Sequence, residues 1–186
     1  MLFRSLPANS LTDILDGSLG IDFQKRGAAG VQADLSIRGG NFDQQLLLIN
    51  GVPINDKQTG HNAFNVHFPV ELIERIEVVQ GAATHIFGNG AYSGAINIVT
   101  KNKPLKSFSL SYGQFNSADF SAVLSSNKFM FATNIQHSDG YKQNTDFYIA
   151  NIFIRYNFKQ NSSNSYIQLI ANSNRFGAFN FYTPKF

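Results

Sequence analysis

The sequence predicts a small mixed α+β unit followed by a set of antiparallel β-strands. The stretch Glu74–Lys101 places several glycines between two short β-branched runs. After residue 103, apolar side chains alternate with small or polar ones in segments of about ten residues, the period of a β-strand. The composition changes at Pro104: residues 1–103 hold seven Phe and Tyr and nine acids, whereas residues 104–186 hold eighteen and three.

The first part begins with a predicted helix over Leu11–Leu15. Asn9 or Ser10 can cap its N-terminus, and the glycines that follow Asp16 are stop signals. The apolar run Leu46–Ile49 then leads into Asn50-Gly51, which is the strongest short signal for a hairpin.

A short helical turn over Pro69–Ile73 is predicted next, because proline is favoured at the first helical position. Two strands follow, over Arg75–Val79 and Ala95–Thr100. The glycines between them indicate that backbone packs closely against backbone. These glycines are Gly81, Gly88, Gly90 and Gly94.

The second part contains five alternating segments separated by turns rich in Asn, Ser, Gly and Asp. One face of the resulting sheet is apolar and aromatic, and the other is mostly small or polar. A soluble sandwich with its apolar face inward and an outer-membrane barrel with that face toward lipid both give this pattern. The apolar positions lie in Phe108–Tyr112, Phe120–Leu124, Phe129–Ile135 and Tyr148–Phe158, and the fifth run is Ser165–Ala171.

Ordered motifs in the first part resemble the plug domain of TonB-dependent outer-membrane receptors. The resemblance covers Leu11–Lys101, and the motifs stand in the family's order and spacing. They are Leu11–Gly20, Ile37-Arg38-Gly39, Leu48–Pro53, Glu74–Val79 and Ala95–Lys101.

This resemblance implies an α+β plug domain followed by antiparallel transmembrane β-barrel strands. We expect the plug over residues 1–103 and about the first five strands over residues 104–186. A family barrel has 22 strands around a plugged lumen, so the barrel would be incomplete and the chain a fragment of a longer protein. We also expect the true start to lie upstream, because Met1–Leu6 is too short for a signal peptide and no TonB box is recognisable before Leu11.

The resemblance also implies contacts between the plug and the barrel wall. The family's matching arginines meet acidic residues of the wall, which identifies Arg38 and Arg75 as candidates, with Glu74 and Glu77 as local acids. Guanidinium suits this role because its planar fork binds a carboxylate through two hydrogen bonds. The alternative is that both arginines are ordinary solvated side chains.

Two polar loops match the plug apices that touch the ligand in the family. They are predicted over Gln24–Asp34 and Asn55–Asn65. Their side chains offer hydrogen bonds to a polar ligand, although generic exposed loops would look the same. The candidate ligand-binding residues are Gln32, Asp34, Gln58, His61 and Asn62.

The sequence gives little support for metal binding, nucleic-acid binding, nucleotide binding or catalysis. The chain has no cysteine, its four histidines lack helix-borne metal spacing, and its net charge of +3 comes from scattered residues, which argues against nucleic acid. Gly88-Asn89-Gly90 precedes a strand and so lacks the helix N-terminus of a dinucleotide site. We therefore expect no cofactor, no metal and no enzymatic activity.

The predicted function is import of a scarce nutrient by a monomeric transporter in the outer membrane of a Gram-negative bacterium. The resemblance implies a cobalamin-like ligand or an iron chelate such as a siderophore, with energy from the TonB–ExbB–ExbD complex. Gln58–Asn62, Phe87–Gly94 and Phe179–Tyr182 are most similar to cobalamin-type receptors of Bacteroidota. The alternative is a soluble β-rich binding or adhesion module, which predicts that residues 104–186 stay monomeric in buffer instead of aggregating without detergent.

Overall fold

The computed structural model describes residues 11–16, 20–26, 31–54, 68–160 and 163–179. The chain divides into two compact units. The first comprises Met1–Asn65 and Ile73–Lys101. The second comprises Asn102–Phe186 together with a segment that ends at Leu72. In the described part, no helix is long and apolar enough to cross a membrane.

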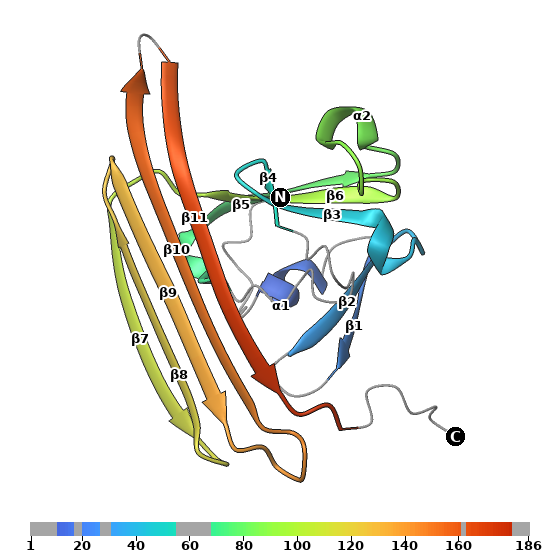
Figure 1. Cartoon of the computed structure of the whole chain (residues 1–186), viewed down its shortest axis with the longest axis vertical. Helices are drawn as coiled ribbons and strands as arrows, with labels where there is room; N and C mark the ends of the chain where they lie inside the picture. Colours follow the sequence, from blue (N-terminus) through green and yellow to red (C-terminus); the bar gives the residue numbers. More distant parts are fainter. Residues whose placement is uncertain (1–10, 17–19, 27–30, 55–67, 161–162, 180–186) are drawn as a thin grey trace. The chain divides into compact units, whose positions relative to one another are not determined.

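The first unit combines short helices with two small sheets (Figure 1). Strands β1 and β2 form an antiparallel pair, and a four-stranded mixed sheet has the order β4-β3-β6-β5. Strand β3 runs parallel to β6, whereas β5 runs antiparallel to it. The elements are α1 (Leu11–Asp16), β1 (Ile21–Arg26), β2 (Gln32–Ile37), η2 (Phe42–Gln44), β3 (Gln45–Ile49), β4 (Val52–Pro53), β5 (Ile73–Gln80), α2 (Thr84–Phe87) and β6 (Gly94–Thr100).

The predicted hairpin lies between β3 and β4. Asn50 and Gly51 have φ angles of 52° and 80°, so both central residues lie in the left-handed region that a two-residue hairpin turn requires. Ile49 pairs with Val52 across this turn. The Asn50-Gly51 signal therefore predicted the turn correctly, and this turn sets the end of β3.

The core of the first unit lies on both faces of the mixed sheet. All five residues of β3 are buried, as are Ile96 and Ile98 of β6. At Gly94 an added Cβ would lie 2.6 Å from the Val79 carbonyl oxygen and 2.8 Å from Cδ1 of Ile37. The predicted close packing of backbone is therefore present at Gly94. The other three glycines of this stretch, Gly81, Gly88 and Gly90, instead adopt positive φ angles.

The second unit is a five-stranded antiparallel sheet in which each strand pairs with its neighbours in sequence (Figure 1). All five strands predicted from the alternation are present, and each extends beyond its predicted run. A short 3-10 helix, η4 (Val70–Leu72), lies where a helical turn was predicted. The strands are β7 (Leu105–Gly113), β8 (Ser117–Ser125), β9 (Phe129–Ser138), β10 (Phe147–Gln160) and β11 (Ser163–Phe176).

The two faces of this sheet differ as predicted. The apolar face is exposed: Phe108 and Leu110 keep 69% of their surface accessible, and Tyr112 keeps 76%. The second face, hereafter the polar face, carries Ser121, Asn134 and Asn151 among its buried residues. It is not polar throughout, because Phe147, Ile149 and Phe153 also lie on it and are buried, and the Phe153 ring contacts Phe68 edge-on at 5.2 Å.

One predicted loop was wrong. The segment Gln24–Asp34 is largely a hairpin, since Gln24–Arg26 continue β1 and Gln32–Asp34 begin β2, with Gln24 opposite Asp34. Its polar composition hid the strands, because β1 reads Ile-Asp-Phe-Gln-Lys-Arg and has few apolar residues. The single turn of α2 was also missed, within a stretch that glycine marked as a turn.

Candidate functional site

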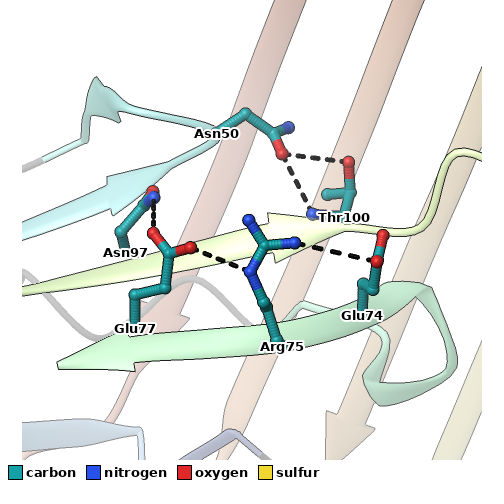
Figure 2. A network of polar contacts seen from close by, with 6 residues as sticks. All are labelled: Asn50, Glu74, Arg75, Glu77, Asn97 and Thr100. Carbon is teal, nitrogen blue, oxygen red and sulfur yellow. Dashed lines mark hydrogen bonds and ion pairs between the residues drawn. The ribbon is translucent and has the colours of Figure 1, made fainter.

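A polar network crosses the mixed sheet of the first unit and joins the family-like motifs (Figure 2). Its six residues come from the β3–β4 hairpin, from β5 and from β6. The network consists of Asn50, Glu74, Arg75, Glu77, Asn97 and Thr100.

Asn97 is the centre of this network. It lies in the buried strand β6, directly opposite Glu77 of β5 and Leu48 of β3. Its Nδ2 donates a hydrogen bond of 2.8 Å to Oε2 of Glu77, and its Oδ1 accepts one of 2.9 Å from the Gly51 N–H. One buried amide therefore ties together the hairpin turn, β6 and β5.

Asn50 holds the other side of the hairpin. Its Oδ1 accepts hydrogen bonds from the Thr100 N–H at 2.9 Å and the Thr100 hydroxyl at 3.1 Å. Its own N–H donates to the Ile98 carbonyl at 2.8 Å. The turn is thus fixed to the end of β6, and the chain leaves β4 in a direction set by these contacts.

Arg75 forms the exposed end of the network. Its Nε donates to Oε1 of Glu77 at 2.8 Å, and its Nη1 lies 3.7 Å from Oε1 of Glu74. The strand register shifts between Ile73 and Arg75, which places Glu74 in a β-bulge. The two acids named as local candidates are therefore the partners of Arg75 in the first unit.

The electrostatics of the network favour an ionised Glu77. The hydrogen bond from Asn97, and then the hydrogen bond and charge of Arg75, lower the pKa of Glu77 below its ordinary value, and desolvation offsets this in part. Because 42% of the Glu77 side chain is exposed, the pair with Arg75 is solvent-screened and its contribution to stability is small.

Arg38 lies apart from this network. It follows β2 with a φ angle of 52°, and its Nε donates to Oε1 of Gln80 at 3.1 Å. Its N–H donates to the Gly20 carbonyl at 3.0 Å. The side chain is exposed, so it remains accessible for the predicted contact with a barrel wall.

The candidate ligand-binding residues fall into two groups. Gln32 begins β2, and Asp34 lies within β2 with only 8% of its surface exposed, which corrects the prediction of an exposed loop side chain. Gln58, His61 and Asn62 lie outside the described residues. Among those that are described, no group of three or more His, Asp or Glu side chains converges as a metal site.

The polar face of the second unit contains a row of small polar side chains. Strand register aligns one such residue from each of the five strands, and Ser109 and Ser121 are joined by a hydrogen bond of 2.9 Å. The side-chain oxygen of Asn134 is buried without a hydrogen-bond partner. The side-chain oxygen and nitrogen of Asn151 are both buried without one as well. The row is Ser109, Ser121, Asn134, Asn151 and Asn172.

Sequence reasoning missed Asn97, the residue that joins the motifs. One signal was present: Asn97 is the one polar residue within the apolar run Ala95–Val99. A polar side chain in a buried strand normally has hydrogen-bond partners, and here they are Glu77 and the Gly51 N–H.

Comparison with known proteins assigns these motifs to a protein family. The model of the TonB-dependent receptor plug domain family matches residues 2–95. The chain belongs to this family. It is a plug domain followed by antiparallel barrel strands, and the polar network of Figure 2 ties together three of the plug's sequence motifs.

Relatives and solved structures agree with this assignment. Over 93 residues the chain is 42% identical to the vitamin B12 transporter BtuB of Vibrio vulnificus (strain CMCP6), which covers 50% of this chain and 15% of that relative. Among solved structures, the copper transporter OprC has a TM-score of 0.67 at 18% identity over 94% of this chain and 30% of its own. The siderophore receptor PirA from Acinetobacter baumannii has a TM-score of 0.60 at 20% identity over 92% of this chain and 30% of its own. At these identities, the solved structures show the fold alone.

Proposed function

We propose that this chain forms the plug and the first barrel strands of a TonB-dependent transporter. The whole protein would bind a scarce nutrient in the outer membrane of a Gram-negative bacterium and release it to the periplasm. The observation that carries the proposal is the 42% identity to a vitamin B12 transporter, which covers 50% of the chain.

The second unit supports placement in a membrane. Its outward face carries large exposed apolar side chains such as Phe108, Leu110 and Ile167, which lipid would cover. Its polar face has unpaired amide groups, which would cost several kcal/mol each in hydrocarbon. These two faces therefore favour a barrel wall with its apolar side toward lipid and its polar side toward the lumen.

Cobalamin is the ligand that we favour, and an iron chelate is the second candidate. The relative with 42% identity is a vitamin B12 transporter, whereas the fold is shared with siderophore and copper proteins. Gln32, Gln58, His61 and Asn62 are the proposed ligand contacts, together with Asp34 if its carboxylate becomes accessible. Energy would come from the TonB–ExbB–ExbD complex.

Arg38 and Arg75 are the proposed contacts between plug and wall. Arg75 already has Glu77 and Glu74 beside it, so contact with a wall carboxylate would compete with these local pairs. Such exposed pairs are individually weak, which suits an interface that must open during transport.

Uptake by cells tests the proposal. A strain that lacks its own vitamin B12 receptor is complemented with the complete gene that encodes this chain, and uptake of radiolabelled cyanocobalamin and of ferric siderophores is measured. We expect cyanocobalamin uptake that disappears when TonB is deleted. Uptake that is unchanged without TonB would contradict the transport mechanism, and uptake of a ferric siderophore alone would reassign the ligand.

Variants in the same strain test the ligand contacts. His61→Ala combined with Asn62→Ala is expected to lower cyanocobalamin uptake at limiting concentration. Gln143→Ala, an exposed residue between β9 and β10, is the matched control with unchanged uptake. Equal uptake by both variants would remove these two residues from the ligand site.

A further inference from the structure

Charge is unevenly distributed between the two ends of the five-stranded sheet. Because the strands are antiparallel, the starts of β7, β9 and β11 lie at the same end as the last residues of β8 and β10. We call this end the basic end; it is the upper end of these strands in Figure 1. Its lysines are Lys103, Lys106, Lys128 and Lys159, all of them exposed.

Among residues 104–186, no acid lies at the basic end. Residues 104–186 contain only Asp119, Asp139 and Asp146 as acids. Asp119 lies near the start of β8, Asp139 directly follows β9, and Asp146 directly precedes β10, which places all three toward the opposite end. Within the described residues, none of the four lysines forms an ion pair.

Hydrogen bonds fix the backbone that carries two of the lysines. Nδ2 of Asn157 donates to Oδ1 of Asn102 at 3.1 Å and to the Asn127 carbonyl at 3.2 Å. The Asn157 N–H donates to the Lys128 carbonyl at 2.7 Å, and the Ser125 hydroxyl donates to the Lys103 carbonyl at 2.9 Å. These hydrogen bonds hold the segment before β7 close to the segment between β8 and β9. The backbone positions of Lys103 and Lys128 are therefore kept near each other.

Aromatic side chains accompany Lys106 on the apolar face. Tyr156 is paired with Phe129 across β10 and β9, and their exposed fractions are 49% and 45%. The Tyr156 ring stacks on Phe158 at 6.3 Å. Lys106 lies on the same face, opposite Leu124. Aromatic rings and long basic side chains together are typical of the boundary between hydrocarbon and headgroups.

We propose that the basic end binds the phosphate groups of anionic glycerophospholipids, whose acyl chains lie along the apolar face. Lysine ammonium groups bind phosphate as compact point charges, and each one near an anionic lipid surface adds to the attraction. The inference rests on the proposed function, because it requires that the apolar face be in lipid.

The turns favour a glycerophospholipid over a lipopolysaccharide. Both connections at the basic end are short, over Ser126–Lys128 and residues 161–162. The opposite end has one short connection, Gln114–Asn116, and the longest connection of the sheet, residues 139–146. In outer-membrane barrels the short turns face the periplasm. The leaflet on that side presents glycerophospholipid headgroups, so phosphatidylglycerol is the appropriate probe.

Vesicle binding tests the inference with the full chain, transferred from detergent into preformed vesicles. The vesicles contain phosphatidylcholine alone, phosphatidylcholine with phosphatidylglycerol, or phosphatidylcholine with lipopolysaccharide. We expect phosphatidylglycerol vesicles to be preferred, with a preference that falls as salt increases. The double variant Lys106→Gln/Lys128→Gln should lower the preference at least about fivefold, and Lys142→Gln/Arg175→Gln, which removes two charges at the opposite end, should retain it.

The outcomes separate this inference from the proposed function. Equal binding to neutral and phosphatidylglycerol vesicles overturns the inference and leaves membrane insertion intact, whereas no binding to any vesicle contradicts both. A preference for lipopolysaccharide over phosphatidylglycerol also overturns it. Equal loss in the two double variants would show a general charge effect without a site at the basic end.

Discussion

The two units of this chain place their apolar side chains differently. In the first unit the apolar side chains of β3 and β6 are buried, and the polar network crosses the sheet through Asn97. In the second unit many large apolar side chains, such as Phe108 and Leu110, are exposed, and polar side chains such as Asn134 and Asn151 are buried. The hydrophobic effect drives apolar groups away from water in both units. Under the proposed function, lipid would replace a protein core for the second unit.

Truncation of one apolar residue in each unit gives the sharpest test of this comparison. Ile98 is fully buried, and Ile98→Ala is expected to destabilise the first unit by roughly 2–5 kcal/mol. Leu110 is 69% exposed, so Leu110→Ala should change stability in detergent by less than about 0.5 kcal/mol. Hydrogen exchange of peptides from β6 and β7 measures the change in stability of each variant. Equal losses of protection would contradict the different surroundings of the two side chains.

Glycine substitutions test packing in the same way. In Gly94→Ala the new Cβ would meet the Val79 carbonyl oxygen at 2.6 Å, so the strands must shift. We expect a loss of about 1–3 kcal/mol. The matched control is Gly113→Ala, where the nearest atom would be Cβ of Ser117 at 4.0 Å. Urea unfolding in detergent compares the two, and a tolerated Gly94→Ala would show that β5 and β6 pack less tightly than the structure indicates.

Removal of Asn97 tests the polar network. Asn97→Ala leaves the Gly51 N–H and Glu77 without their partner, which should cost about 1–3 kcal/mol in the first unit. Asn89 is exposed and belongs to the same unit, so Asn89→Ala should change little. Exchange of the Gly51 amide is the direct readout, and its protection should fall only in Asn97→Ala.

The smallest effect is a pH dependence carried by Glu77. Because the pKa of Glu77 is lower in the folded state than in the unfolded state, its contribution is present above the unfolded pKa and is lost as pH falls through the folded pKa. We expect less than about 1 kcal/mol because the pair with Arg75 is solvent-screened. Glu77→Gln should flatten this part of the stability profile, and an identical profile in the variant would assign the effect to other carboxyls.

The sequence predicted features that depend on nearby residues. The Asn50-Gly51 turn, the helix at Leu11 and the five strands of the second unit all follow from local patterns. Asn97 was missed because its partners become neighbours only when β6 pairs with both β3 and β5. Asp34 was predicted in an exposed loop because the polar residues of β1 concealed the hairpin to which Asp34 belongs. The burial of Asp34 in β2 depends on packing that a local pattern does not encode.

The parallel pairing of β3 with β6 has a consequence for the order of folding. Gln45 pairs with Gly94, so the two central strands of the mixed sheet cannot meet until about 50 residues of intervening chain have been brought together. In the second unit each strand pairs with its neighbour in sequence, which favours fast assembly. We therefore expect the five-stranded sheet to form first, starting from the turns between its strands. The mixed sheet forms later because it depends on a long-range contact, and the hydrogen bonds from the β3–β4 turn to β6 form last.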